Sequence, residues 1–374
     1  MYEIYADDIL IYSPDLISDK LYITNPTYEK EVNKSGSCRF SIFPENPYYN
    51  HLKALKTRIV VKDNGQEVWR GRILNMTTNF DKTKSVSCEG VQSFFVDSII
   101  RPFKHTKTMA DQFRYIIDKH NEEVEDFKKF TVGTIDVDDP YGSKEWEKTG
   151  YSTAKENIES ILSDYGGYFV IGWNGTQNTI SYRKNPAKTT NQAIDFGENL
   201  LNLTDTVNPS NVFTVLIPTG HDANDNPIDI KPINDGKDYI ESEEGINLYG
   251  RVTYQHEFSE TISSASDLLQ KGTDFLTKNI KASRTISVKA IDLHMLDATV
   301  DRIDVFDLLK VRSEPHGVDE YQMCTKIKID LQSPDNNEYI IGTVPEGIEA
   351  VIAGTSSVSI SGGSSLPNGD NVQY

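Results

Sequence analysis

The sequence has few of the residues that most often bind metals or form cross-links. Among its 374 residues there are three cysteines and seven histidines. No two cysteines form a CxxC pair and their count is odd, which argues against a disulfide framework or a thiolate zinc site. Cys38, Cys88 and Cys324 each lie in an apparent strand, so we interpret them as buried structural thiols.

Signatures of enzymes are also missing. The sequence has no HExxH, GxSxG, P-loop or GxGxxG motif, and no two histidines stand four residues apart as zinc ligands do on a helix. His294 stands between Asp292 and Asp297, which gives a possible triad-like cluster. We interpret this cluster as the polar end of a strand, and we predict that the chain is not an enzyme.

Positive charge is scarce relative to negative charge. The 38 lysines and arginines face 56 aspartates and glutamates, so the formal net charge is −18. An acidic chain of this kind repels the phosphates of nucleic acids and of anionic lipids. The charge therefore argues against a DNA-binding module and against docking on a membrane surface.

Long apolar runs are absent as well. No stretch approaches the roughly 18 apolar residues of a membrane-spanning helix. The N-terminus carries acidic residues where a secretory signal needs a basic start and an apolar run. We therefore expect a soluble protein without a membrane anchor, made in a cytoplasm, which reaches any later destination by assembly or lysis.

The residues that are plentiful favour strands. The sequence has 19 tyrosines and 15 phenylalanines beside many threonines, isoleucines and valines. In residues 1–97 short apolar–polar alternations are separated by turn-forming segments, which predicts a first β-barrel-like domain. Asp63-Asn64-Gly65 stands between two such runs and predicts a hairpin turn, because Asn-Gly accepts positive φ angles.

The stretch VWRGRILNMTTNFDKTKSVSCEG (68–90) is the strongest local candidate for a reactive site. Its alternation predicts instead a hairpin with its turn at residues 80–84, with Leu74 and Met76 on one face. Arg70 and Arg72 fall on the same parity as Leu74, so we expect them where that face reaches the end of the sheet. A phosphate-binding arginine pair is the alternative.

Residues 98–200 predict an α+β domain. Apolar residues recur at helical spacing after Thr108, a plausible N-cap, and His120 lies on that apolar stripe as a packed histidine. A second helix follows the capping box of Thr153 and Glu156 and ends at Gly166. A hairpin with a turn at Asn174-Gly175 then completes the domain.

Residues 201–352 return to strands, with one helix capped by Ser264, and predict a second β-barrel-like domain. The segment LLKVRSEPHGVDEYQMCTKIKI has the same outline as RIVVKDNGQEVWRGRI, a hint of two related β units near the two ends of the chain. These domains need not be continuous in sequence. Residues 353–374 are rich in serine and glycine and predict a flexible tail or linker.

Two acidic loops are candidate cation sites. One contains Asp136, Asp138 and Asp139. The other contains Asp222, Asn224 and Asn226 at alternating positions, but it lacks the glycine and the distal glutamate of an EF-hand. We interpret both as solvated turns and expect no cofactor, with calcium as the alternative.

Several motifs together resemble one family. The first part of the chain resembles the start of the siphophage tail proteins labelled prophage endopeptidase tail. It shares with them a small-residue strand entry, an Asn-Pro-Tyr turn, a Gly-Arg strand and a Cys-Glu-Gly strand end, and further matches run along nearly the whole chain. The matching residues are Asn46, Pro47, Gly71, Arg72, Cys88, Glu89, Gly90, His120, Asn121, Gly166, Gly167, Asp235, Gly236, Asp238, Tyr239, Asp292, Leu293, Pro315, His316 and Gly317.

The resemblance implies a fold and a function. It implies a mostly β, baseplate-hub-like chain with two small β-barrel-like domains and inserted α+β domains, similar to the central hub of contractile phages. Such hubs are homotrimers at the tail tip of the virion, so the implied partners are a distal tail protein hexamer, receptor-binding proteins and the tape-measure protein. Phage DNA would pass through without specific binding. The C-terminal lysin module of longer family members has no counterpart here.

Two other functions stay open beside a structural tail-tip hub that closes the tail tube and opens for DNA ejection. The first is a cell-wall peptidase or hydrolase, which would use His294 or Asp292. The second is a module that binds host saccharides through exposed Trp69, Trp146 or Trp173.

Overall fold

The computed structural model describes residues 1–16, 20–186, 188–209, 212–258, 261–280 and 283–342. The chain divides into two compact units. The first unit comprises Met1–Val207 and the described residues from Arg284 onward, and the second runs from Asn208 to Ser283. The tail predicted over residues 353–374 lies outside the described residues.

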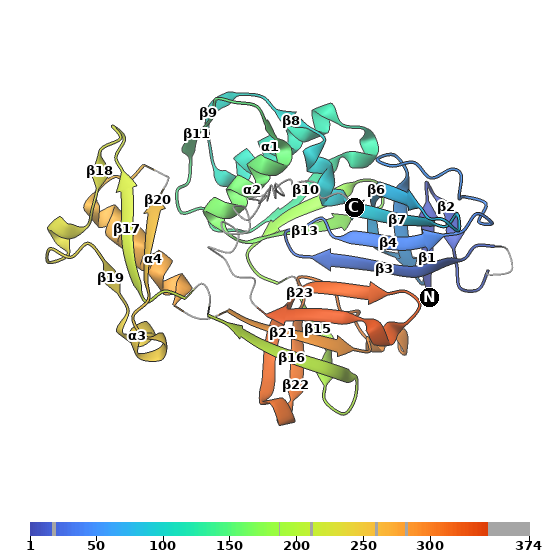
Figure 1. The fold of residues 1–374 in the computed structure, drawn as a ribbon. Helices are drawn as coiled ribbons and strands as arrows, with labels where there is room; N and C mark the ends of the chain where they lie inside the picture. Colours follow the sequence, from blue (N-terminus) through green and yellow to red (C-terminus); the bar gives the residue numbers. More distant parts are fainter. Residues whose placement is uncertain (17–19, 187, 210–211, 259–260, 281–282, 343–374) are drawn as a thin grey trace, which may run out of the picture. The chain divides into compact units, whose positions relative to one another are not determined.

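The N-terminal part of the first unit is an antiparallel, barrel-like sheet (Figure 1). Its strands alternate buried and exposed side chains, as in β4, so that one face packs into a core of Ile, Val, Phe and Tyr residues. The spatial order is β3-β4-β7-β6-β5-β1-β2. The strands are β1 (Tyr2–Ala6), β2 (Ile9–Tyr12), β3 (Ile23–Glu31), β4 (Ser37–Ile42), β5 (Arg58–Asp63), β6 (Gln66–Thr78) and β7 (Lys84–Gly90).

Strands β5 and β6 form the predicted hairpin. Asn64 and Gly65 connect them with φ angles of 49° and 78°, as a tight hairpin turn requires. The predicted hairpin of β6 and β7 is also present, but Leu74 and Met76 do not share the core face. The pairing of β6 with β7 shifts between Ile73 and Asn75, so a bulge leaves Leu74 42% exposed.

The second barrel-like sheet is built from the C-terminal strands and joins the first edge to edge. Residues 326–330 of β23 pair antiparallel with residues 27–31 of β3, which makes one continuous 13-stranded sheet over a shared core. Its strands are β15 (Thr189–Asp195), β16 (Leu200–Asn208), β21 (Ser283–Ala290), β22 (Leu308–Ser313), β23 (Val318–Asp330) and β24 (Glu338–Gly342). The segments of similar outline in the sequence form the hairpins β5–β6 and β22–β23. In each hairpin the second strand has 13 residues.

An α+β module lies between the two sheets in sequence and has a core of its own. Its sheet, β10-β14-β13, packs with the helices α1 (Met109–Glu123) and α2 (Ala154–Tyr165). Thr108 and Thr153 accept the predicted capping hydrogen bonds from Asp111 and Glu156. The strands are β8 (Ile99–Ile100), β9 (Phe103–Lys107), β10 (Phe130–Ile135), β11 (Lys144–Lys148), β12 (Ser152–Thr153), β13 (Tyr168–Trp173) and β14 (Asn178–Arg183).

The second unit is inserted between β16 and β21, inside the segment predicted as the second barrel-like domain. It is a small mixed sheet with the predicted helix α4 (Ala265–Asn279), which Ser264 caps and which contacts β17. Helix α3 (Glu243–Tyr249) was not expected from the sequence, because its seven residues span less than two repeats of an apolar stripe. The strands are β17 (Val215–His221), β18 (Pro227–Ile228), β19 (Ile240–Glu241) and β20 (Thr253–Phe258).

The predicted fold class, mostly β with α+β insertions and two barrel-like sheets, is confirmed. All three cysteines are free and buried, as predicted. Cys38 and Cys88 are direct neighbours across β4 and β7. No helix among the described residues is long and apolar enough to cross a membrane.

Candidate functional site

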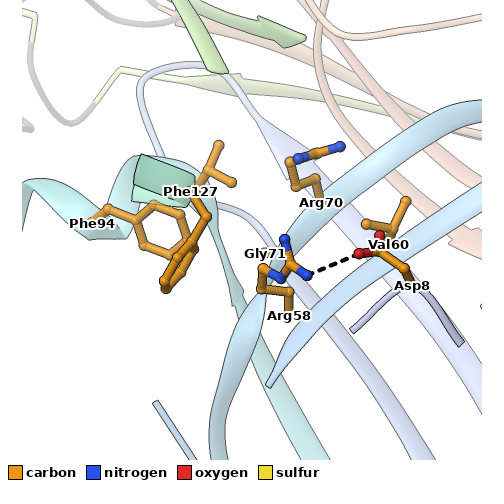
Figure 2. A pocket seen from close by; sticks show the side chains of 8 residues that line it. Asp8, Arg58, Val60, Arg70, Gly71, Phe94 and Phe127 are labelled. Atoms are coloured by element: carbon orange, nitrogen blue, oxygen red, sulfur yellow. Dashed lines mark hydrogen bonds and ion pairs between the residues drawn. The ribbon is translucent and has the colours of Figure 1, made fainter. Parts of the chain in front are cut away.

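A half-open groove of about 370 Å³ lies on the outer side of β1, β5 and β6. It is lined by Tyr5, Asp8, Val60, Lys62, Gly65, Glu67, Arg70 and Trp173. A smaller pocket of about 20 Å³ shares Asp8, Val60 and Arg70 with it, so the two hollows adjoin. Figure 2 shows that smaller end, where the rings of Phe94 and Phe127 lie on one side and Arg58 and Arg70 point into the space beside them.

Three cations along this groove each lie against an aromatic ring. The guanidinium of Arg70 lies 3.4 Å from the centre of the Trp173 ring, the ammonium of Lys62 lies 4.5 Å from that of Tyr5, and the guanidinium of Arg58 lies 6.0 Å from that of Phe127. Cation–π attraction orients such pairs. The groove therefore carries fixed rings and fixed positive charges.

Two of these cations are neutralised by carboxylates. Arg70 donates to both oxygens of Glu67 at 2.7 and 2.5 Å, and Arg58 donates to Asp8 at 2.9 Å (Figure 2). No carboxylate among the described residues lies within ion-pair distance of Lys62. Glu3 and Glu67 are the cross-strand neighbours of Lys62 but form no ion pair with it, so the ammonium of Lys62 can contact an external anion.

Arg72 does not form a phosphate-binding pair with Arg70, and it is not at the end of the sheet. It is 4% exposed, donates to Glu89 at 2.7 Å and to Asp97 at 2.9 Å, and lies 5.1 Å from the ring centre of Phe94. Lys128 also contacts the carboxylate of Asp97, at 2.9 Å. Arg72 therefore ties the first sheet to the α+β module.

The pKa of Asp97 reflects this network. Burial raises it, but hydrogen bonds and attraction from Arg72 and Lys128 outweigh burial and hold the pKa below its usual value. The carboxylate stays ionised between its two cations. Its role is to join two parts of the unit rather than to exchange protons.

The cluster around His294 has no triad geometry. Asp292 is buried and accepts hydrogen bonds from Gln192 at 2.7 Å, from the backbone N–H of His294 at 3.0 Å and from that of Ile303 at 3.1 Å. Nδ1 of His294 donates to the carbonyl of Val300 at 2.6 Å and not to a carboxylate. A catalytic base needs a carboxylate at that nitrogen and a nucleophile at the other. The side chains of Asp292 and His294 instead stabilise the loop between them and Ile303 through hydrogen bonds to its backbone.

His120 is fully buried, as a packed histidine is. Its Nδ1 lies 2.7 Å from the hydroxyl of Ser98 and its Nε2 lies 3.1 Å from the carbonyl of Lys128. Burial lowers the pKa of His120, so the ring is neutral and carries its proton on Nε2. Neither nitrogen is left for catalysis or for a metal.

The oxygens of the two acidic loops are already engaged. Asp136 accepts from Arg183 at 2.7 Å, and Asp138 pairs with Lys184. Asp139 accepts from the backbone N–H of Met109 at 2.9 Å. In the second loop, Asp222 accepts from Asn224 and Asn226 and closes a tight turn.

No metal-binding group of three or more histidine, cysteine or acidic side chains is gathered within the described part of the chain. The absence of a cofactor stays a prediction with calcium as its alternative, and the contacts of these side chains do not favour calcium.

The three tryptophans have different environments. Trp69 is 5% exposed and belongs to the core. Trp146 donates its indole N–H to the carbonyl of Lys107 at 2.9 Å and stacks on Tyr165. Trp173 is 37% exposed and lies in the groove. Of the three predicted saccharide platforms, only Trp173 has the required exposure and surroundings.

The remaining family-motif residues shape the backbone. Gly71 and Gly90 are partners across β6 and β7, and a Cβ atom at Gly71 would lie 2.0 Å from the carbonyl oxygen of Glu89. The side chain of Asn46 donates a hydrogen bond to the carbonyl of Ile11. The side chain of Asn121 donates to the carbonyl of Phe130 and accepts from its backbone N–H. Turns, connecting segments or short 3-10 helices contain Pro47, Gly166, Gly167, Asp235, Gly236, Asp238, Tyr239, Leu293, Pro315, His316 and Gly317.

Sequence reasoning missed most of the groove. Tyr5, Arg58, Lys62 and Glu67 alternate outward on three strands, and this alternation was the available signal. Nothing in the sequence shows that β1 lies beside β5 or that Trp173, about 100 positions away, reaches the same face.

The comparisons with known proteins agree with this fold. Residues 187–351, which hold the second barrel-like sheet and the inserted unit, match the sequence profile of the family described as "Prophage endopeptidase tail". The resemblance seen in the sequence is thereby confirmed. A search of curated protein sequences found no match.

Solved structures extend the likeness over most of the chain. One is the 43 kDa tail protein of prophage MuSo2 from Shewanella oneidensis, with a TM-score of 0.62 and 15% identity over 92% of this chain and 98% of that one. The tail protein from Neisseria meningitidis MC58 has a TM-score of 0.61 and 12% identity over 91% and 96%. Prophage tail protein gp18 from Listeria monocytogenes EGD-e has a TM-score of 0.55 and 16% identity over 88% and 91%. At these identities the likeness is one of fold.

Proposed function

We propose that the chain is a structural component of a phage tail, the hub at the tail tip of the virion. The observation that carries this proposal is the profile match over residues 187–351 together with a fold shared with prophage tail proteins over about nine-tenths of the chain. The hub closes the distal end of the tail tube and opens for DNA ejection.

The assembly we propose is a homotrimer that meets a distal tail protein hexamer. The two barrel-like sheets are joined through β3 and β23 and contain hairpins of similar outline. Three copies with two such sheets each would present six similar faces, so a trimer can meet a six-fold ring without a large symmetry mismatch. Receptor-binding proteins and the tape-measure protein are the other partners we propose.

The charge of the chain suits the passage of DNA. A net charge of −18 repels phosphates, so a channel wall made of this protein would not retain the passing DNA. A strongly basic bore in a trimer would contradict this part of the proposal.

The proposed hub has no catalytic role of its own. The contacts of Asp292 and His294 support this, because both polar groups are used to hold a loop. In a peptidoglycan-release assay we expect no lysis by the purified chain. If the purified chain lysed peptidoglycan and the variant His294→Ala did not, the proposed function would be that of a cell-wall hydrolase instead of a structural hub.

Light scattering on the purified chain, alone and with the distal tail protein, tests the assembly. We expect the mass of three copies, either alone or after addition of the hexamer. A monomer that stays a monomer in the presence of the hexamer would overturn the proposed hub.

A further inference from the structure

The groove over β1, β5 and β6 has no part in the proposed hub function, and its chemistry indicates a ligand. Its volume of about 370 Å³ lies in the range of small-molecule sites, roughly 300–1,000 Å³. Sites of this kind combine aromatic walls with a few polar groups in fixed positions. The groove has both, as described above.

Strand pairing fixes the polar groups of the groove. Val60 faces Arg70 across β5 and β6, and it faces Tyr5 across β1 and β5. Lys62 follows Val60 by two positions, so both side chains point to the same side of the sheet. Side chains on paired strands hold their geometry better than side chains on loops, so the site is preorganised.

The balance of charges decides which class of ligand fits. A polyanion such as a nucleic acid would be repelled by the carboxylates of Asp8 and Glu67 as well as attracted by the cations, so it would gain little binding free energy. Carboxylates accept hydrogen bonds from hydroxyl groups. The groove therefore suits a ligand with several hydroxyl groups and one negative charge, placed on Lys62.

The aromatic groups complete the description. Trp173 and Tyr5 offer apolar ring surface next to these polar groups, and the C–H face of a sugar ring packs on such surfaces. Trp173 is held by Arg70 and is still 37% exposed. A flat aromatic group beside paired acidic and basic side chains is what a pyranose with equatorial hydroxyls requires.

We propose that this groove binds an acidic saccharide, with the sugar ring beside Trp173, its hydroxyl groups donating to Asp8 and Glu67, and its carboxylate or phosphate on the ammonium of Lys62. This binding site adds a recognition function to the chain and does not depend on trimerisation or on closure of the tail tube.

The test is a titration of the intact chain with matched sugars. N-acetylmuramic acid and N-acetylglucosamine differ by one carboxylate-bearing substituent, and glucuronate and glucose differ by one carboxylate. Isothermal calorimetry and tryptophan fluorescence measure binding. We expect the acidic sugar of at least one pair to bind with a Kd in the millimolar range or below and at least about fivefold more tightly than its neutral counterpart.

Three variants assign the effect to the groove. Lys62→Gln should remove the preference for the acidic sugar, Lys62→Arg should restore it, and Trp173→Ala should weaken both sugars about tenfold. Lys148→Gln, a lysine of β11 outside the groove, should change nothing. Equal melting temperatures will show that the variants are folded, since both groove side chains are on the surface.

Three results would overturn the proposal. The first is equal binding of acidic and neutral sugars by the unchanged chain, and the second is binding that Lys62→Gln and Trp173→Ala leave intact. The third is absence of binding by every sugar up to about 50 mM, a concentration that detects a Kd near the weak end of the millimolar range. None of these results affects the proposed hub, which the mass measurement with the distal tail protein tests separately.

Discussion

Asp307 offers a sharp test of the structure of the first unit, because its carboxyl group is buried among like charges. The residue is 5% exposed. Burial, and to a smaller degree the negative charge of Asp304, raise its pKa from 3.8 to about 7, while Lys188 and Lys30 act in the opposite direction. At neutral pH and above, the folded chain must therefore ionise a group that its surroundings disfavour.

The sign of the effect follows from proton linkage. Between pH 3.8 and about 7 the folded chain binds this proton more tightly than the unfolded chain does. The stability contributed by protonated Asp307 is complete below that window and is lost as the pH rises through it. Asp307→Asn cannot ionise, so the variant escapes this loss.

The magnitude follows from the size of the shift. A change of about 3 pKa units corresponds to an upper limit of about 4 kcal/mol in the free energy of unfolding. Structural relaxation and entry of water reduce such penalties, so we expect Asp307→Asn to be about 2 kcal/mol more stable than the unchanged chain at pH 8.5. At pH 4 we expect the two proteins to be equal within about 0.5 kcal/mol.

Urea denaturation followed by tryptophan fluorescence measures this difference. All three tryptophans lie in Met1–Val207, so the signal reports the unit that contains Asp307. Asp118→Asn, an exposed carboxylate on α1, is the matched control and should show no dependence of the difference on pH. A stability difference that is the same at pH 4 and pH 8.5 would refute the reasoning.

Three further predictions concern other groups of the first unit. Arg72→Ala removes a buried guanidinium from the half-buried carboxylates of Glu89 and Asp97 and leaves Asp97 with Lys128 alone, so it should destabilise the first unit by about 2 kcal/mol in urea, whereas Arg39→Ala on the exposed side of β4 should cost less than about 0.5 kcal/mol. Gly71→Ala places a Cβ atom against a backbone carbonyl and should lower the melting temperature by more than 10 °C, or abolish folding, while Gly150→Ala, in open space, should leave it unchanged within about 2 °C. Because burial lowers the pKa of His120, that histidine should destabilise the fold as the pH falls below 6.5. NMR titration of its ring should give a midpoint below 6.5, and a midpoint at or above 6.5 would contradict the described burial.

Local patterns predicted the local elements well. The caps at Thr108, Thr153 and Ser264 each fixed the start of a helix, because a cap depends on hydrogen bonds within four residues. The turn at Asn64-Gly65 was equally readable from its φ requirements. Such features need no knowledge of the rest of the chain.

Features that depend on distant contacts were not readable. The bulge at Leu74 reverses which side of β6 faces the core, so Met76 packs against the core while Leu74 is exposed, and alternation alone wrongly places the two on one face. Arg72 was expected at the end of a sheet, but the α+β module covers it and supplies Asp97 and Lys128. The groove was missed for the same reason, since Tyr5, Lys62 and Trp173 meet only after three separate segments have folded.

The place where the inserted unit interrupts the chain has a consequence for folding. The backbone of Ile291 donates to the carbonyl of Asn199, so the start of β16 lies beside the end of β21 and the two strands are antiparallel neighbours. Pairing them directly would close a loop of roughly 75 disordered residues, about 2.5 kcal/mol more costly in chain entropy than a turn of four. A unit that folds first brings its two ends together and acts as a rigid turn, so its early folding would speed the closing of the sheet around it.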